Sequence, residues 1–409
     1  MNSTDIDKIL RDGLTRLMPD GKKILLIIPD MTRSAPVADM VRRIHHVLCA
    51  AGARHDIMVA LGTHPPLAAP DLCRHLGVVR GSLEDAYPGV RVMNHAWNDP
   101  ASLMRVGVIP AARIAELSGG LMAEDVPLTL NRAIRDYDQL LILGPVFPHE
   151  VAGFSGGSKY LFPGISGPEM IDFFHWLGAV ITNLKLIGIR DNPVRAVLEE
   201  AAAQAPVPVH AVSLVVHDGR LVHLSVGAVA ESWRAAVEQS QRLHVVYKPR
   251  LYQRVLVCAP KMYDDLWTGG KCMYKCEPVV AGGGEIIIYA PHISSFSVTH
   301  GAMLERIGYH VRDYYLKQME RFAEVPRAVL AISTYLKGAG AFEHGVETAR
   351  IRVVLATGIS RAMCERSGLG YADPARLDLR DWQDRESKGI LFVPRGGETL
   401  YLPIKGQKV

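Results

Sequence analysis

Short β-rich runs alternate with helical patterns along the first part of this chain. Residues 23–30 (KILLIIPD) predict a buried strand, and residues 36–52 predict a helix that ends at a glycine. Further strands are predicted at 55–64, 90–95 and 139–149. Because successive parallel strands are joined by crossover helices, this order predicts a mostly parallel α/β sheet that helices cover on both faces.

The alternation is interrupted at residues 208–227, where two runs of alternating apolar residues meet at Asp218-Gly219. Asp-Gly between two such runs is a strong signal for a tight turn, because the turn needs positive φ at both positions. This segment therefore predicts an antiparallel hairpin.

A second α/β unit is predicted to begin near Tyr247. Strands are expected at 254–260 and 285–291, with a helix between them that the glycines at 282–284 end. With 409 residues the chain is long enough for two domains. We expect two α/β domains, 1–246 and 247–409, with mostly parallel sheets and an active-site cleft between them.

The overall charge and hydropathy exclude some classes of protein. Lys and Arg number 46 against 42 Asp and Glu, a net charge of +4, and the basic residues are scattered. This does not favour nucleic-acid binding. The chain has no apolar run of about 18 residues, the length that a membrane span needs, and its N-terminus lacks the apolar core of a signal peptide. We expect a cytoplasmic protein without nucleic-acid or membrane partners.

The six cysteines do not form a recognisable metal-binding or disulfide pattern. Cys272 and Cys276 share a helix face if that segment is helical, but no second half of a metal site lies nearby in the sequence. Free thiols are favoured over metal or disulfide roles. His45 and His46 lie on a predicted helix and are expected to be partly solvated.

A glycine-rich stretch at 149–164 (HEVAGFSGGSKYLFPG) carries His149 and Lys159, and His175 follows sixteen residues after the lysine. Glycines weaken a fold unless the backbone must approach something closely. We therefore expect a bound, charged organic group, with or without a metal, beside Gly153, Gly156, Gly157 and Gly164.

The individual residues leave alternatives open. Lys159 could bind phosphate, form a covalent adduct through its amine, or be solvated. It does not belong to a P-loop, because Tyr160 stands where that motif needs Ser or Thr. His175 lies on an apolar predicted helix, as either a core residue or a ligand.

Polar residues also follow the first two predicted strands. Asp30, Thr32 and Arg33 could clamp an anion at the ligand edge of the sheet, or cap the next helix with Arg33 solvated. His64 could be catalytic or a hydrogen-bonded loop residue. In the second domain, Lys271 after two glycines could reach an anionic substrate or lie at the surface.

These motifs together resemble the nickel-pincer lactate racemase family of 2-hydroxy acid racemases and epimerases. The resemblance keeps the motif order over nearly the whole chain. It rests on DxTRxxP, GTH, PHxxxGFSGGxK with PGxxG, a histidine sixteen residues past that lysine, and a lysine after a D-L-aromatic segment. It implies two α/β domains, the first carrying the cofactor motif and the second closing the cleft.

The resemblance also implies a cofactor and roles for particular residues. The cofactor would be a nickel pincer nucleotide, a pyridinium mononucleotide with thioamide and thiocarboxylate sulfur donors, covalently attached through Lys159. His175 would complete the nickel coordination. His64 and His149 would be the acid/base pair, Arg33 and Lys271 would hold the substrate, and Asp30 and Thr32 would lie against the ribose and phosphate of the cofactor.

The implied reaction inverts the α-carbon of a 2-hydroxy acid by hydride transfer to the pyridinium ring, and it requires cofactor-synthesis enzymes as partners. Hydride removal avoids a carbanion beside a carboxylate. Trp267 and Thr268 stand where lactate enzymes show Tyr-Gln, and they are expected to line the substrate pocket. They favour a substrate larger than lactate, with an aldonic acid preferred. Lactate or malate racemisation, and a sensor that binds a hydroxy acid without turnover, are the alternatives.

Overall fold

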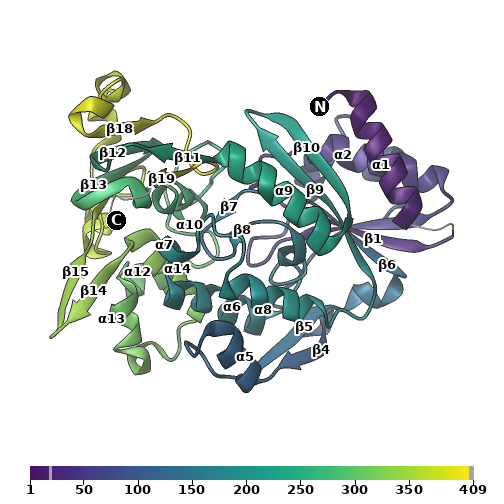
Figure 1. The fold of residues 1–409 in the computed structure, drawn as a ribbon, viewed down its shortest axis with the longest axis horizontal. Coiled ribbons are helices and arrows are strands. Elements are labelled where there is room, and N and C mark those ends of the chain that lie inside the picture. Colours follow the sequence, from purple (N-terminus) through teal and green to yellow (C-terminus); the bar gives the residue numbers. More distant parts are fainter. Residues whose placement is uncertain (18–20, 405–409) are drawn as a thin grey trace. The chain divides into compact units, whose positions relative to one another are not determined.

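The computed structural model describes residues 1–17 and 21–404 and forms two compact units (Figure 1). Both units are discontinuous: unit 1 contains residues 1–147, 155–171 and 193–243, and unit 2 contains residues 148–154, 172–192 and 244–409. Two short segments from the first half of the chain thus pack with the second half. The domain boundary predicted between residues 246 and 247 stays a proposal. The last five residues of the second predicted domain, 405–409, lie outside the described residues.

Unit 1 is built on a six-stranded sheet of order β10-β9-β6-β1-β2-β3, in which only β10 is antiparallel to its neighbour. In the centre of the sheet, Lys23 of β1 pairs with Arg54 of β2, and Ile24 of β1 pairs with Gln139 of β6. The strands predicted at 23–30, 55–64 and 90–95 are confirmed, and the one predicted at 139–149 ends at Pro145, since residues 148–149 form the separate strand β7 of unit 2. Their bounds, with those of the hairpin, are β1 (Lys23–Pro29), β2 (Arg54–Ala60), β3 (Val92–Asn94), β6 (Gln139–Pro145), β9 (Val209–His217) and β10 (Arg220–Ala228).

Helices cover this sheet, and the best-defined layer is formed by α1 and α2. Ile24 and Leu26 of β1 pack in one apolar cluster with Met40 and Ile44 of α2, and all four are fully buried. Each such side chain contributes about 1.5–3 kcal/mol by leaving water. The remaining elements of this unit are α1 (Ser3–Leu17), α2 (Val37–Ala50), α3 (Ala69–His75), α4 (Leu83–Ala86), α5 (Ala111–Ser118), α8 (Pro193–Ala202), all but the last residue of α9 (Val229–His244), and the antiparallel pair β4 (Leu103–Ile109) and β5 (Val126–Asn131).

The hairpin predicted at 208–227 is confirmed. β9 and β10 pair antiparallel, with His217 opposite Arg220 across the turn. Asp218 has φ of 48° and Gly219 has φ of 73°, so both central residues occupy the left-handed region that a tight hairpin turn requires.

Unit 2 contains a five-stranded, fully parallel sheet of order β17-β16-β13-β12-β18. Leu256, Ile287 and Val354 from its three central strands pack in one buried cluster with Trp382. Its strands are β7 (Pro148–His149), β8 (Gly153–Phe154), β11 (Val245–Lys248), β12 (Tyr252–Cys258), β13 (Val280–Ala290), β14 (Gly340–Glu343), β15 (Val346–Ala349), β16 (Arg352–Thr357), β17 (Gly370–Tyr371), β18 (Ile390–Val393) and β19 (Leu400–Pro403).

The helices of unit 2 are mostly short. Among them α6 begins in unit 1 and lies mainly in unit 2. They are α6 (Pro168–Ile181), α7 (Asn183–Leu186), α10 (Leu266–Gly269), α11 (Lys271–Tyr274), α12 (Gly301–Ile307), α13 (Arg312–Leu316), α14 (Arg327–Lys337) and α15 (Arg361–Arg366).

The glycines at 282–284 do not end a helix, so that prediction is wrong. The helix ends at Tyr274, and the glycines lie inside β13 at an irregularity where the pairing steps from Tyr252–Val280 to Arg254–Glu285. Gly283 has φ of 75°, which fits a bulge in which extra residues are inserted into one strand.

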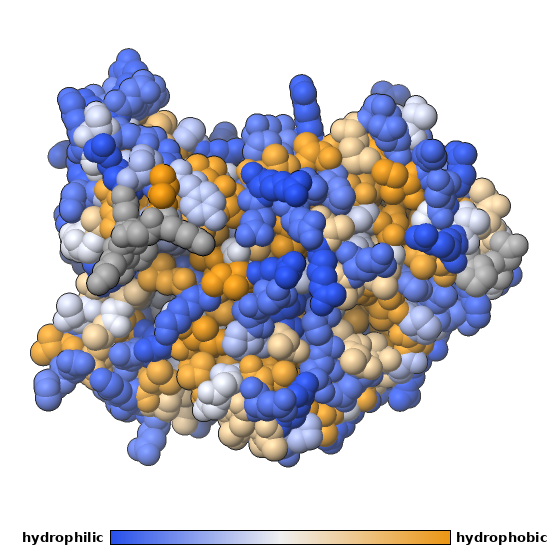
Figure 2. Space-filling model, in the orientation of Figure 1, coloured by the Kyte–Doolittle hydropathy of each residue, from blue (hydrophilic) through white to orange (hydrophobic). Residues whose placement is uncertain are grey.

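The predicted fold class, α/β with mostly parallel sheets, is confirmed for each unit. Hydrophilic and hydrophobic residues are interspersed over the face shown in Figure 2. Among the described residues, no helix combines the length and the apolar composition that a bilayer crossing demands.

The hairpin turn provides a test of the fold. Replacing Gly219 with Ala forces a Cβ into the left-handed region, and we expect a loss of about 1–2 kcal/mol of unfolding free energy. Urea denaturation measures it. Gly227→Ala in β10 is the matched control, since Gly227 has no positive φ and its new Cβ would meet only Glu231 Oε2 at 3.6 Å. Equal losses in the two variants would contradict the explanation.

Candidate functional site

The loop after β1 gathers three of the predicted site residues. Asp30 Oδ1 accepts hydrogen bonds from the backbone N–H of Thr32 at 3.1 Å and from its hydroxyl at 2.7 Å. Arg33 Nη1 donates to Thr32 Oγ1 at 2.8 Å. Helix α2 begins after Pro36 without a side-chain cap, so the alternative in which Asp30 or Thr32 caps this helix is wrong.

The carboxylate of Asp30 also holds His64, which follows β2. Asp30 Oδ2 is in hydrogen-bond contact with His64 Nδ1. Burial disfavours the charged carboxylate, but the positive charges and hydrogen bonds of His64, Arg33 and Thr32 outweigh it and hold the pKa of Asp30 well below its usual 3.8. Because Nδ1 faces an ionised carboxylate, it carries a proton, and in a neutral imidazole Nε2 is then the free base.

The turn that carries Lys159, η3 (Gly157–Tyr160), is anchored by helices α8 and α9. The indole N–H of Trp233 donates to the carbonyl of Ser155 at 2.8 Å. Arg195 donates to the carbonyl of Gly156 at 3.3 Å, and its guanidinium lies 4.1 Å from the centre of the Trp233 ring. Burial lowers the pKa of Arg195 to about 10.

The glycines of this stretch are explained by packing within the protein. A Cβ on Gly157 would lie 3.0 Å from the Trp233 ring, and one on Gly156 would lie 2.8 Å from a methyl group of Val146. At Gly153 and Gly164 the obstacles are the backbone carbonyls of Ile189 and Tyr160, at 1.9 and 2.3 Å. The expectation that these glycines make room for a ligand needs correction, because the close approach is made by the chain itself.

Tyr160 joins the turn to the edge of the sheet. Its ring covers Gly144 of β6, where a Cβ would lie 2.2 Å from the phenol oxygen. Burial raises the pKa of Tyr160, and the nearby charges of Arg33 and Asp30 act on it in opposite directions. Tyr160 was not predicted as a site residue, although its place directly after Lys159 was a usable signal.

Unit 1 therefore brings its predicted site residues to one edge of the sheet. The η3 turn packs against β1 and β6, and the N–H of Gly62, at the end of β2, donates to the carbonyl of Gly164 at 3.1 Å. Lys159 is partly exposed at this edge, as are Arg33 and His64.

In unit 2, His149 lies on β7 and is held in a defined orientation. Its Nδ1 accepts hydrogen bonds from the backbone N–H groups of Val151 at 3.1 Å and Ala152 at 3.4 Å. A neutral His149 consequently carries its proton on Nε2. The carboxylate of Glu150 lies 3.5 Å from the same Nδ1, farther than either N–H donor.

His175 lies near His149 on α6, with Phe174 next to both. The ring centres of His149 and Phe174 are 6.5 Å apart, and those of Phe174 and His175 are 5.0 Å apart. Tyr335 donates its hydroxyl hydrogen to the carbonyl of His175 at 2.7 Å. The His175 side chain is partly exposed on a helix whose apolar residues are mostly buried, which argues against a purely core role.

The segment with Trp267, Thr268 and Lys271 is tightly packed. The Thr268 hydroxyl donates to the Asp265 carboxylate at 2.9 Å, so only its lone pairs remain for a ligand. The Trp267 ring centre lies 5.0 Å from that of His300. The N-cap residue Asp265 was missed, although an Asp before a helix is a recognised sequence signal.

Lys271 is partly exposed, and its Nζ lies 4.7 Å from the centre of the Tyr263 ring. The preceding glycines are buried. A Cβ on Gly269 would meet Ile293 at 2.8 Å, and one on Gly270 would meet the Leu266 carbonyl at 3.3 Å. As in the first glycine-rich stretch, internal packing explains them.

These donors suit the cofactor that the motifs imply. Lys159 offers a primary amine on a rigid, partly exposed turn of unit 1. His175 offers a partly exposed imidazole in unit 2, and imidazole is a suitable ligand for nickel.

Parts of this chain are similar in sequence to known lactate racemases. Residues 5–186 match the family described as lactate racemase N-terminal domain. The lactate racemase of Lactiplantibacillus plantarum is 30% identical over 164 residues, which are 39% of this chain and 34% of that protein. The lactate racemase of Thermoanaerobacterium thermosaccharolyticum is 26% identical over 204 residues, 47% of this chain and 42% of that protein. The matches thus span about a third to two fifths of these relatives.

Two solved structures share the fold. A protein from Thermotoga maritima superposes with a TM-score of 0.90 at 30% identity, covering 99% of both chains. The lactate racemase apoprotein from Thermoanaerobacterium thermosaccharolyticum superposes with a TM-score of 0.71 at 19% identity, covering 97% of this chain and 92% of that one.

The contact between Asp30 and His64 predicts a pH-dependent stability. We expect Asp30→Asn to lower the unfolding free energy at pH 7 by about 1.5–3 kcal/mol, since it removes a charged hydrogen-bond acceptor. A carboxylate whose folded-state pKa is depressed stabilises the fold above its unfolded pKa and loses this effect as the pH falls through the folded value.

The difference between wild type and Asp30→Asn should therefore be constant from pH 7 to about 5 and shrink below about pH 4. Urea denaturation at several pH values measures it. Asp39→Asn, which removes a partly exposed ion pair with Arg43 on α2, is the control and should change stability by less than about 1 kcal/mol. A difference that grows as the pH falls would contradict the assignment.

Proposed function

We propose that this chain, whose residues 5–186 match the family described as lactate racemase N-terminal domain, is an isomerase that inverts the α-carbon of a 2-hydroxy acid. One observation carries the proposal: His64 and His149 are held by different partners in opposite protonation patterns. A racemase needs a base for one face of its substrate and an acid for the other.

The histidine tautomers define the two roles. Asp30 accepts the Nδ1 proton of His64, so Nε2 of a neutral His64 can take the hydroxyl proton of a substrate. Backbone N–H groups donate to Nδ1 of His149, so the Nε2–H of the neutral ring is left to hydrogen-bond to the substrate oxygen and polarise it. When a hydride returns to the substrate, the proton taken by His64 can return to the substrate oxygen. A binding protein that senses a hydroxy acid has no use for such a pair, which disfavours that alternative.

Arg33 and Lys271 are proposed to hold the substrate carboxylate and oxygen. Both are partly exposed cations. Arg33 donates a hydrogen bond to Thr32, and Nζ of Lys271 lies over the Tyr263 ring. A planar guanidinium pairs with a carboxylate through two parallel hydrogen bonds, which fixes the orientation of the α-carbon.

The cofactor is proposed to be a nickel pincer nucleotide, with Lys159 as its covalent anchor and His175 as a nickel ligand. When bound, this group supplies a pyridinium ring that accepts and returns a hydride. We also propose that Asp30 and Thr32 lie against the ribose and phosphate of this group. In the structure the two side chains hydrogen-bond to each other.

An aldonic acid is the proposed substrate, in preference to lactate or malate. Trp267 would offer a broad ring and an indole N–H, and Thr268 has a shorter side chain than the Gln of the lactate enzymes. The Thr268 hydroxyl donates to Asp265, so it would accept a hydrogen bond from a substrate hydroxyl. A site with such polar groups favours a substrate that satisfies them.

Covalent attachment is tested by mass spectrometry. In protein produced together with the cofactor-synthesis enzymes, Lys159→Ala and Lys159→Arg should both lack the cofactor adduct, because neither offers a primary amine. Lys185→Ala, at an exposed position, should keep it. His175→Ala should keep the adduct and lose nickel. An adduct of unchanged mass on Lys159→Ala would place the anchor elsewhere.

Turnover is tested on the same preparation with single enantiomers of lactate and malate and with gluconate. We expect inversion, with kcat/KM highest for gluconate. His64→Ala and His149→Ala should each lower kcat by about 10²–10⁴-fold in both directions, while the exposed His46→Ala should not. Ligand binding without inversion would favour the sensor, and preference for lactate would refute only the aldonic acid.

A further inference from the structure

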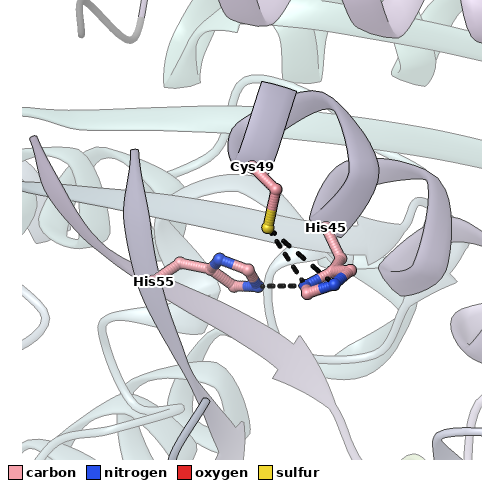
Figure 3. A group of neighbouring side chains, drawn as sticks. All are labelled: His45, Cys49 and His55. Atoms are coloured by element: carbon pink, nitrogen blue, oxygen red, sulfur yellow. Dashed lines mark hydrogen bonds between the residues drawn. The ribbon is translucent and has the colours of Figure 1, made fainter. Parts of the chain in front are cut away.

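A second group of potential metal ligands lies in unit 1, away from the candidate active site. His45 and Cys49 are on α2 and His55 is on β2, and the three side chains point toward one another (Figure 3). Their ligand atoms lie within 4.8 Å of one another. His45 and Cys49 are four residues apart, so they share one face of the helix.

The distances match those of a tetrahedral site. His45 Nδ1 lies 3.3 Å from His55 Nε2 and 3.7 Å from Cys49 Sγ. Zinc bonds of about 2.05 Å to nitrogen and 2.3 Å to sulfur, at the tetrahedral angle, separate two nitrogens by about 3.3 Å and nitrogen from sulfur by about 3.6 Å. All three ligand atoms lie within 4.8 Å of one another, but Cys49 Sγ is also 3.8 Å from His45 Nε2. A single ion on Nδ1 therefore needs the Cys49 side chain to turn toward that nitrogen.

We propose that His45, Cys49 and His55 bind one Zn²⁺ ion, with water as the fourth ligand. Two imidazoles and a thiolate are the ligands that zinc prefers, whereas Mg²⁺ and Ca²⁺ prefer oxygen. Cys49 is exposed and His55 is buried, so the site opens to solvent on the cysteine side. The water position follows from this opening.

The protonation of the histidines agrees with this site. Burial, reinforced by the charge of His45, lowers the pKa of His55 to about 4, and burial also lowers the pKa of His45. Lowered pKa values favour the neutral imidazole, which is the form that binds metal. Tyr87 packs edge-on against His45, with ring centres 5.2 Å apart, and limits rotation of that imidazole.

The position of the site in the fold indicates a structural role. His55 is at the amino end of β2, whereas His64 follows the carboxyl end of the same strand. The ion would join α2 to β2 at the edge of the sheet opposite the candidate active site. Zinc bound in this way stabilises the folded chain and takes no part in turnover.

Cobalt titration tests the proposal, because Co²⁺ occupies zinc sites and reports thiolate ligation by a charge-transfer band in the near ultraviolet. The metal-free, full-length chain is used with His175→Ala in every sample, which removes the proposed nickel ligand. We expect one Co²⁺ per chain, a thiolate band, and displacement of cobalt by Zn²⁺.

Cys49→Ser should abolish the band and weaken Zn²⁺ binding by roughly 100-fold or more, a larger effect than loss of an outer-shell partner. Cys73→Ser and His46→Ala are matched controls in the same unit and should change neither measurement. Because Cys49 is exposed, its replacement should leave the fold intact, and circular dichroism checks this. Absence of the band before mutation would show that no thiolate binds the metal, and its persistence in Cys49→Ser would assign the band to another cysteine. Either result would overturn the proposal.

Discussion

The indole of Trp233 fixes the turn on which the proposed cofactor attachment depends. Residues 155–164 contain a single short 3₁₀ turn, so few of their backbone groups are paired in regular structure. Trp233 supplies a hydrogen bond to Ser155, and its ring fills the space that a side chain at Gly157 would occupy. Arg195 pairs with the next carbonyl and lies against the same ring. Lys159 therefore extends from a rigid turn, which favours attachment of a large group in one orientation.

The electrostatics of the two proposed acid/base residues follow from local contacts alone. A carboxylate with a depressed pKa holds His64, and two backbone N–H groups hold His149. Both sets of hydrogen bonds involve Nδ1 and leave Nε2 unengaged by these partners. They impose opposite tautomers, because Asp30 accepts a proton from Nδ1 of His64 whereas N–H groups donate to Nδ1 of His149.

Much of the fold could be predicted from local patterns. The parallel strands of unit 1 and the Asp218-Gly219 hairpin were predicted because both depend on neighbouring residues. Gly282–Gly284 were misassigned, since a bulge inside β13 depends on the pairing with β12. Contacts between residues far apart in the sequence likewise could not be predicted from local patterns.

The site was predicted unevenly for the same reason. Asp30, His64 and the other motif residues were found from their motifs, but the partner of Asp30 was not, because thirty-four residues separate it from His64. The motif glycines were assigned to a ligand, whereas Trp233, seventy-six residues after Gly157, explains one of them. The contact between His45 and His55 is likewise set by the packing of α2 on β2.

The central claim is that this chain inverts a 2-hydroxy acid by moving the α-hydrogen as a hydride. The most direct measurement uses one enantiomer of a 2-hydroxy acid labelled with deuterium at the α-carbon, incubated in ordinary water with the loaded protein. Chiral chromatography with mass spectrometry then follows the product. The account predicts that the opposite enantiomer forms and keeps its deuterium, because a hydride does not exchange with water. Inversion with loss of the deuterium to solvent would contradict it.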